Sequence, residues 1–346
     1  MMGKVVKEHL IKALASGDFV SGQQLGEQLG ISRTAISKHI KALSEMGLDI
    51  YCVTGKGYKL AQPLQLLDKE KIAQSLVSMQ ALTQTKLINC YSGATSETVS
   101  ETSPIEVHNL IDSTNSYLLR RLPNQLQQGQ VCLAEFQSAG RGRRGRQWIS
   151  PFGSHIYLSF YWYLEQGMSA AMGLSLITAL AVSDAIKYSL AINVQLKWPN
   201  DIYLDGVKLA GILIDLEGQA SEPSHSVIGI GLNLRMPTQS AQLIDQRWTD
   251  LQSHTNQVID RNELSAAIIF YLRKRLEQHQ IEGLGSMTDE WHQQDVYLNK
   301  KVKLITGERI TKGICRGINN QGALMLEVDG QIKPVYGGEV SLRGDE

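Results

Sequence analysis

The sequence has few cysteines, and their spacing does not suit a metal site. The four cysteines lie far apart in the chain, and no C-x-x-C pair occurs. Such spacing argues against a zinc site and against a disulfide framework. It is typical of a protein from a reducing cytosol.

Long hydrophobic runs are missing as well. No apolar run reaches the roughly 18 residues that a membrane span requires. The N-terminal segment, Met1–Leu14, carries several charged side chains, and no apolar stretch long enough for a signal peptide follows it. We therefore expect a cytoplasmic protein without a membrane segment.

Nor is there an excess of charge of one sign, because 34 basic residues balance 34 acidic ones. The chain as a whole is not a polycation, so any binding to nucleic acid must come from a local basic surface. The chain has 346 residues, of which 42% are hydrophobic, so it can bury the cores of two or three domains.

Changes in composition divide the chain and predict an α+β multidomain fold. Helical patterns and a short hairpin occupy residues 1–62, and a linker helix with a polar loop occupies 63–106. Strands and helices alternate over 107–292, and short β-like runs make up 293–346.

The linker helix has a clear start and one apolar face. Asp68 is a good N-cap, and Ile72, Leu76 and Met79 recur at helical spacing. The following stretch, Asn89–Glu106, is rich in Ser, Thr and Glu. We expect it to be a surface loop and assign it no chemistry.

The N-terminal domain has the pattern of a helix-turn-helix. A short helix at Gln24–Leu29 is broken by Gly30, and Ser32 caps a second helix over Arg33–Met46. Apolar residues recur at i, i+4 and i+7 in the second helix, so one face is buried and the other offers donors for base edges and phosphates. The apolar residues are Ile36, Ile40 and Leu43.

A hairpin follows and resembles a wing. Two short strands, 48–53 and 58–60, flank a glycine turn that places Lys56 at the tip, where it can contact backbone phosphate. A helical subdomain with a solvated polar face is the alternative, but this order of elements favours a DNA-binding winged helix. The candidate DNA-binding residues are Ser32, Arg33, Thr34, Ser37, Lys38, Lys41 and Lys56.

The strongest signal in the sequence is a loop of glycine and arginine, Gly140–Arg146, with four arginines within six residues. Glycine allows the backbone to approach a ligand closely. Arginine offers planar forks that match carboxylate and phosphate oxygens, and we expect the loop to be mobile until an anion orders it. An arginine-rich RNA-binding patch and a solvated turn are alternatives. The loop is not of the Walker A type, because it lacks that pattern.

Three other segments accompany the arginine loop. Asp112–Asn115 offers hydroxyl and amide groups at the start of a helix, although an ordinary N-cap would look the same. Lys197–Asp201 lies where a strand turns, and Lys208 stands near the start of a buried strand. A third strand, Val227–Leu234, has small residues against which a flat ligand can lie. A single lysine would be taken as a surface residue, but this combination indicates a site for anionic ligands.

The C-terminal segment predicts a small SH3-like β-barrel. Its turns at Asn319-Asn320 and Asp329-Gly330 are typical of hairpins. The expected strands are 302–305, 313–315, 323–328 and 331–333. This domain is either a structural cap or, through Arg316, a lid over a nucleotide.

Taken in order, these motifs resemble the bacterial bifunctional biotin–protein ligases that also repress the biotin operon. The resemblance covers nearly the whole chain, and it implies a class II synthetase-like mixed α/β domain between the winged helix and the barrel. The segments that carry it are Ser32–His39, Gly55–Tyr58, Asp112–Asn115, Gly140–Arg146, Lys197–Asp201, Lys208–Gly211, Lys333-Pro334 and Gly337–Glu339.

The resemblance implies roles for matching positions, and no protein side chain is among them as a metal ligand. The implied catalytic residues are Lys208, Arg143 and Arg141. The implied biotin-binding residues are Ser113, Thr114, Asn115, Gln137, Gly140, Arg141, Gly142, Arg143, Trp148, Lys208 and Gly211. The implied ATP-binding residues are Arg143, Arg146, Lys197, Asn200, Asn233 and Arg316.

The resemblance also implies ATP, Mg²⁺ and biotin as the small molecules of the reaction, with biotinyl-adenylate as intermediate and co-repressor. The implied partners are the biotin carboxyl carrier protein of acetyl-CoA carboxylase, operator DNA and, when adenylate is bound, a second copy of the chain. Two alternatives remain open. One is a ligand-sensing repressor without ligase activity, and the other is a lipoate-type ligase on the same fold.

Overall fold

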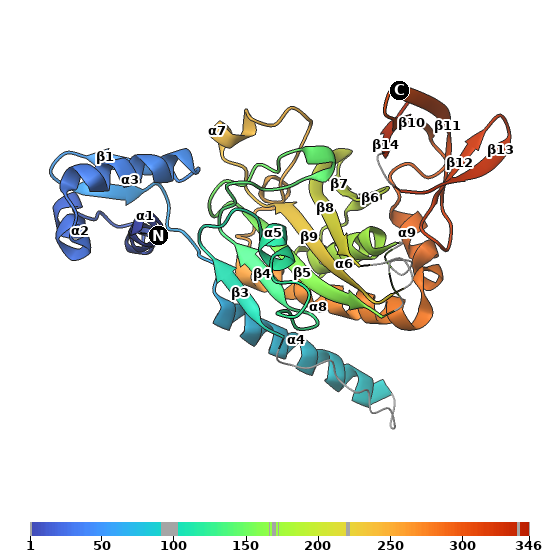
Figure 1. Ribbon diagram of the computed structural model, residues 1–346, viewed down its shortest axis with the longest axis horizontal. Coiled ribbons are helices and arrows are strands. Elements are labelled where there is room, and N and C mark those ends of the chain that lie inside the picture. The colour runs from blue at the N-terminus through green and yellow to red at the C-terminus, as the bar shows by residue number, and fades with distance from the viewer. Residues whose placement is uncertain are drawn as a thin grey trace.

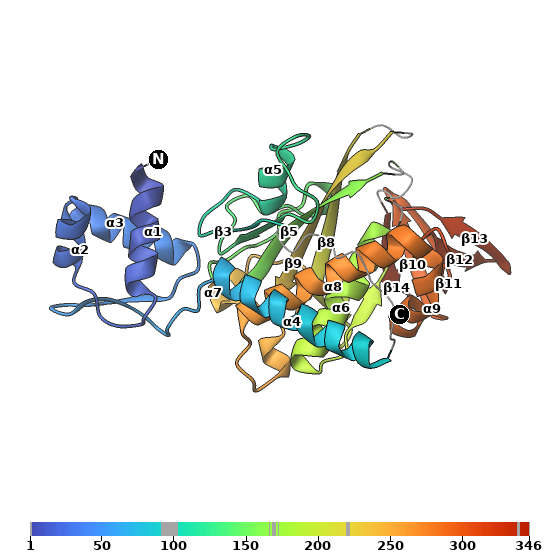
Figure 2. The same cartoon turned by 90° about the horizontal axis from the view of Figure 1, so that it is seen from below.

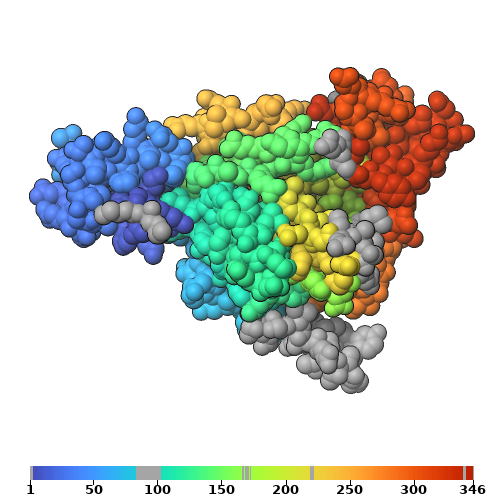
Figure 3. All heavy atoms as spheres, in the orientation of Figure 1, coloured from blue at the N-terminus to red at the C-terminus, as the bar shows by residue number. Residues whose placement is uncertain are grey.

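The computed structural model describes residues 2–90, 103–165, 167, 171, 173–218, 222–337 and 340–345. An N-terminal helical domain, a central domain built on a large sheet and a C-terminal β domain follow one another along the molecule (Figures 1 and 3). Within the described part of the chain, none of the helices combines the length and the apolar character needed to cross a membrane.

The N-terminal domain is a winged helix. Its elements are α1 (Met2–Leu14), α2 (Gly22–Leu29), α3 (Arg33–Glu45), β1 (Ile50–Val53) and β2 (Gly57–Leu60). Gly30 ends α2 with a φ of 65°, and the Ser32 hydroxyl accepts a hydrogen bond from the Ala35 N–H (3.2 Å). The apolar face that the sequence predicted for α3 is buried. The sequence did not delimit α1, whose Leu10 and Leu14 are buried in the same core.

The linker helix, α4 (Lys69–Cys90), begins as predicted. The Asp68 carboxylate accepts hydrogen bonds from the N–H groups of Glu70 (2.9 Å) and Lys71 (3.2 Å). The expected loop at Asn89–Glu106 was too long at both ends, because α4 includes residues 89–90 and strand β3 begins at Ile105. The rest of that prediction, residues 91–102, falls outside the described residues.

A seven-stranded sheet forms the central domain, with the order β3-β4-β5-β9-β8-β7-β6. Only β3 and β4 are parallel among these neighbours. The strands are β3 (Ile105–His108), β4 (Val131–Ala134), β5 (His155–Leu164), β6 (Gln195–Lys197), β7 (Asp201–Leu204), β8 (Val207–Glu217) and β9 (Ser224–Asn233).

Helices cover both faces of this sheet, which is why its central strands are apolar on both sides. In Figure 2, α4, α6 and α8 lie on one face and α5 lies on the other. The helices of the domain are α5 (Thr114–Leu119), α6 (Leu174–Leu190), α7 (Thr238–Ala241), α8 (Arg261–Glu282) and α9 (Thr288–Gln294), with short 3₁₀ turns η1 (Arg143–Gly145), η3 (Gln252–His254) and η4 (Leu284–Met287). The open half of the α5 face is where the site lies.

The C-terminal domain is a five-stranded antiparallel sheet in the order β13-β12-β11-β10-β14. Its strands are β10 (Lys301–Thr306), β11 (Arg309–Ile318), β12 (Leu324–Val328), β13 (Gln331–Val335) and β14 (Val340–Gly344). The hairpin at Asp329-Gly330 has the expected left-handed backbone, with φ values of 51° and 76°. The sequence missed β14, which follows the glycine pair at 337–338.

A buried ion pair ties the linker to the central domain. Arg261, at the start of α8, donates to the Glu135 carboxylate (2.7 Å), and both side chains are almost completely buried. Glu135 also accepts the Leu67 N–H, and Arg261 also donates to the backbone carbonyl of Gln65 (3.2 Å). The linker segment before α4, which connects the DNA-binding domain to the central domain, is therefore held by these polar contacts as well as by packing.

Candidate active site

A cavity of about 390 Å³ opens over β8 and β9, beneath the arginine loop. This volume is in the range of small-molecule sites. Nearly all of the predicted small-molecule-binding residues meet there, although they come from segments more than 100 residues apart. The predicted residues that line it are Ser113, Thr114, Asn115, Gln137, Arg141, Gly142, Arg143, Arg146, Trp148, Lys197, Asn200, Lys208, Gly211 and Asn233.

One end of the cavity is a buried polar pocket at the start of α5. The Gln137 amide oxygen accepts hydrogen bonds from the N–H (2.9 Å) and the hydroxyl (3.2 Å) of Thr114. The Ser159 hydroxyl on β5 donates to Thr114 or to Asn115, both of which are within hydrogen-bonding distance. Ser113 caps the helix by accepting the Ser116 N–H. These groups form a fixed set of donors and acceptors for an uncharged polar ligand group.

Two glycines of β9 leave room for the side chains of Asn115 and Trp148 to pack directly against the strand. A Cβ atom on Gly229 would be 2.3 Å from the Asn115 amide oxygen, and one on Gly231 would be 2.4 Å from the Trp148 ring. Within the described residues, the indole N–H of Trp148 is buried without a hydrogen-bond partner. It is therefore available to a ligand that brings an acceptor.

The other end of the cavity is cationic. The Lys208 ammonium lies 2.7 Å from the Asp201 carboxylate and 5.6 Å from the centre of the Trp148 ring. Lys197, which is nearly buried, lies 3.7 Å from the same carboxylate. The Arg143 guanidinium donates to the Asn200 side-chain oxygen (2.8 Å). Burial lowers the pKa of Arg143 below its usual value, but a guanidinium stays charged.

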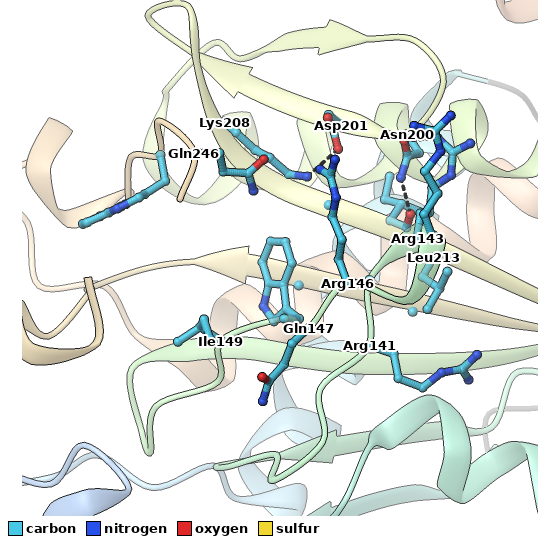
Figure 4. A pocket seen from close by; sticks show the side chains of 18 of the residues that line it. Arg141, Arg143, Arg146, Gln147, Ile149, Asn200, Asp201, Lys208, Leu213 and Gln246 are labelled. Carbon is cyan, nitrogen blue, oxygen red and sulfur yellow. Dashed lines mark hydrogen bonds and ion pairs between the residues drawn. The ribbon is translucent and has the colours of Figure 1, made fainter. Parts of the chain in front are cut away.

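The arginine loop has a defined, hairpin-like conformation. The Gly142 N–H donates to the Arg146 carbonyl (2.8 Å), and the Trp148 N–H donates to the Gly140 carbonyl (2.9 Å). Figure 4 shows Arg143 and Arg146 directed toward Asn200 and Asp201, whereas Arg141 points the other way. The loop thus divides its charges between two sides of the site.

Arg141 reaches an acidic residue of β8. Its guanidinium makes two hydrogen bonds of 3.0 Å to the Asp215 carboxylate. Asp215 also accepts a hydrogen bond from the Asn115 amide (2.8 Å). The loop and the polar pocket are joined through this carboxylate.

The predicted DNA-reading surface lies on the N-terminal domain. All seven candidate DNA-binding side chains are exposed. At the wing, Lys56 and Lys59 lie 5.7 Å and 5.5 Å from the centre of the exposed Phe19 ring. The cations at the wing are therefore held close together at one end of the molecule.

Three family models match successive parts of the chain. The HTH domain matches residues 6–59, the Biotin/lipoate A/B protein ligase family matches 107–233, and the Biotin protein ligase C terminal domain matches 297–343. The bifunctional ligase/repressor BirA of Salmonella typhimurium is 45% identical over 337 residues, or 97% of each chain. The protein of the same name from Escherichia coli is 44% identical over 346 residues, which is 100% of each chain.

The chain belongs to the bifunctional biotin ligase/repressor family.

The fold of the chain is also similar to that of a solved biotin protein ligase. The biotin protein ligase from Aquifex aeolicus, in complex with biotin and ATP, superposes with a TM-score of 0.60 at 27% identity. It covers 70% of this chain and 100% of its own.

Arg316 lies outside the cavity in this ligase/repressor chain, and its role as a nucleotide contact stays a prediction. Its guanidinium donates to Glu327 (2.6 Å) and Asn299 (2.6 Å) inside the C-terminal domain. The C-terminal residues that line the cavity are instead Val340, Ser341 and Leu342 of β14. Gly140, the first residue of the loop, does not line the cavity, and a Cβ atom on it would be 2.4 Å from the Trp148 carbonyl oxygen. A side chain does not fit there, and the biotin-binding role of Gly140 stays a prediction.

Sequence reasoning gave no role to Asp201, Asp215 and Ser159, three polar residues in or beside the site. Asp201 stands in a motif that was recognised, but it was given no role beside Lys208. Asp215 follows the largely apolar stretch 209–214 of β8, and a carboxylate at that position is a signal that could have been used. Ser159 stands between apolar residues of β5, and the sequence gives no sign of its role. Only the packing of α5 against the sheet brings its hydroxyl close to Thr114 and Asn115.

Proposed function

We propose that this protein activates biotin with ATP and transfers it to a lysine of the biotin carboxyl carrier protein of acetyl-CoA carboxylase. The observation that supports this best is one cavity with a neutral polar pocket at one end and a lysine–arginine cluster at the other. Biotin offers an uncharged ureido ring and a carboxylate in the same order. The relatives named for biotin ligation, including the Paracoccus denitrificans protein at 32% identity over 62% of this chain, favour biotin over lipoate.

In the first step, a biotin carboxylate oxygen attacks the α-phosphorus of ATP and pyrophosphate leaves. Both reactants are anions, and two unit charges about 4 Å apart repel by roughly 4 kcal/mol at an effective dielectric of 20. Lys208 and Arg143 lie where they can neutralise this repulsion and stabilise the charge that grows on the α-phosphate. Asp201 orients the Lys208 ammonium through their 2.7 Å ion pair.

Mg²⁺ bound with the triphosphate would neutralise charge on the departing pyrophosphate. The described residues contain no cluster of three or more His, Cys, Asp or Glu side chains that could hold a metal ion. Phosphate oxygens and water would then complete the coordination of the ion. The Asp201 carboxylate, which lines the cavity, is a hard oxygen donor of the kind that Mg²⁺ accepts.

In the second step, the carrier lysine amine attacks the acyl carbon, the amide bond forms, and AMP and a proton leave. The adenylate reacts with water unless it is covered. The arginine loop, closed by its own hydrogen bonds beside Trp148, provides that cover. Positioning of the amine against the carbonyl supplies much of the rate enhancement.

A carrier assay tests this function directly. Incubation with ATP, Mg²⁺, a carrier domain and biotin should increase the mass of the carrier by one biotinyl group, whereas lipoate should give little product. Pyrophosphate exchange into ATP should depend on biotin in the same way. Labelling by lipoate alone would identify a lipoate-type ligase, and adenylate binding without labelling of the carrier would identify a ligand-sensing repressor.

We also propose that biotinyl-adenylate drives formation of a homodimer that presents two α3 helices to a palindromic operator in the cytoplasm. The exposed donors of α3 and the cations of the wing support contact with DNA. Addition of the adenylate should shift the sedimentation coefficient from monomer to dimer and tighten operator binding. An adenylate that leaves sedimentation unchanged would contradict the coupling without affecting the ligase reaction.

A further inference from the structure

The hairpin of β6 and β7 places three polar side chains on the face of the sheet that the cavity occupies. Lys197 lies directly opposite Asp201 in this antiparallel pair, and Tyr203 is two residues further along β7. Side chains of directly opposed residues, and of residues two apart in a strand, project from the same face. The three polar residues therefore share one face, whereas Leu196 and Ile202 are buried on the other.

An irregularity in the next strand brings Lys208 to the same face. The pairing of β7 with β8 is regular at Asp201 and Ile202, and the register then shifts. Beyond the shift, Tyr203 lies opposite Lys208. Without it, Leu209 would lie opposite Tyr203, and Lys208 would turn to the buried face of the hairpin. Two lysines thus lie beside a single carboxylate.

The two lysines have different hydrogen-bond acceptors. The Lys208 ammonium lies 2.7 Å from the Asp201 carboxylate, whereas the Lys197 ammonium lies 3.7 Å from it. Lys197 instead donates to the Tyr203 hydroxyl (2.8 Å), and its ammonium lies 4.8 Å from the centre of the same ring. The Lys197 side chain is only 10% exposed, so water offers little replacement for that hydroxyl.

We propose that Tyr203 is a positioning residue that holds the Lys197 ammonium at the cationic end of the cavity and keeps it away from Asp201. Tyr203 itself does not line the cavity, so it acts through Lys197. Without the hydroxyl, the Lys197 ammonium would move to the Asp201 carboxylate, where it would compete with Lys208 and withdraw from an incoming phosphate. The consequence for ATP rests on the proposed function, whereas the contact between Lys197 and Tyr203 does not.

Tyr203→Phe removes the hydroxyl and keeps the ring, so it tests the contact with little change in packing. In biotin-dependent pyrophosphate exchange, the KM for ATP should rise about fivefold, the usual effect of losing one hydrogen bond, while the KM for biotin stays within about twofold. Tyr163→Phe is the matched control and should change neither KM, because Tyr163 lies on β5 of the same sheet and pairs with His225, outside the cavity. Equal increases in both KM values for Tyr203→Phe, or no increase, would overturn the proposal.

A double-variant comparison decides whether Tyr203 acts through Lys197. Lys197→Met should raise the KM for ATP by more than about tenfold, and adding Tyr203→Phe should raise it further by less than about twofold. A second fivefold increase in the Lys197→Met background would show that the hydroxyl acts by another route, and the proposal would be wrong. Circular dichroism spectra that match the wild type establish that each variant is folded.

The contact itself has a measurement that does not depend on catalysis. In urea denaturation, Tyr203→Phe should lower the midpoint of the wild-type protein, and this shift should vanish in the Lys197→Met background. Equal shifts in the two backgrounds would mean that the hydroxyl and the ammonium do not interact, which contradicts the proposal. If the wild-type protein exchanges no pyrophosphate, the proposed function fails, and the denaturation result still decides whether Tyr203 holds Lys197.

Discussion

Replacing Lys208 with alanine is expected to reduce the rate of adenylate formation by about 10²–10³-fold, the usual effect of removing one preorganised charge from a reacting centre. Lys208 is the cation that Asp201 fixes at 2.7 Å, and its side chain is only 17% exposed in the cavity. Its charge is therefore poorly screened by water, and its loss leaves the carboxylate–phosphate repulsion uncompensated. Biotin-dependent pyrophosphate exchange measures this step without the carrier.

The control for this variant must remove a lysine without touching the site. Lys187 is exposed in the last turn of α6, and Lys187→Ala should exchange pyrophosphate at the wild-type rate. Binding of Lys208→Ala to nonspecific DNA at low salt should also be unchanged, because the winged helix is a separate domain. An equal loss of exchange and DNA binding would indicate misfolding instead of a role in the reaction.

The Arg261→Met variant is expected to lower the free energy of unfolding by about 3–5 kcal/mol, because it leaves the Glu135 carboxylate buried without its counterion. Glu135 is 0% exposed and also accepts the Leu67 N–H from the linker, so the carboxylate cannot turn to solvent. Urea denaturation measures the change. Replacing Glu135 with leucine in the same chain should recover much of the lost stability, since the charge is then gone.

An exposed pair in the same protein provides the comparison. Arg120 forms a pair of similar length with Asp112, through two hydrogen bonds (2.6 and 3.0 Å), but the two side chains are 55% and 44% exposed. Arg120→Met should therefore change the stability by no more than about 1 kcal/mol. Similar losses of unfolding free energy in the Arg120 and Arg261 variants would show that burial does not control how much the Arg261–Glu135 pair contributes to stability.

Local sequence signals predicted the elements whose ends are set by their own residues. Ser32 and Asp68 accept the N–H groups that a helix start leaves unpaired, and Gly30 supplies the left-handed backbone at a helix end. Local sequence signals were weaker predictors where an element depends on a neighbour that is distant in the chain. Strand β3 is only four residues long and needs β4 beside it, so Ile105 was assigned to a loop.

The candidate site shows the same division. The arginine loop and the lysine motifs were identified because arginine, lysine and glycine in these runs have few structural uses. The contact of Arg316 with Glu327 on the neighbouring strand β12 was not predicted, because an isolated arginine gives no sign of its partner. Asp215 was missed for the corresponding reason, because its partner Arg141 lies 74 residues away.

The sequence by itself determined which kinds of chemistry this protein can perform, since residue type fixes charge, hydrogen-bonding capacity and local backbone preference. It determined the helix caps, the turn at Asp329-Gly330 and the concentration of cations in one loop. Only the tertiary structure decided which of those cations face the reactants and which are paired. That choice depends on the pairing of β5, β7, β8 and β9, which brings Asp201 into the cavity and places Asp215 and Ser159 against Asn115, which lines it. Contacts between residues far apart in the chain arise from packing, and no local pattern encodes them.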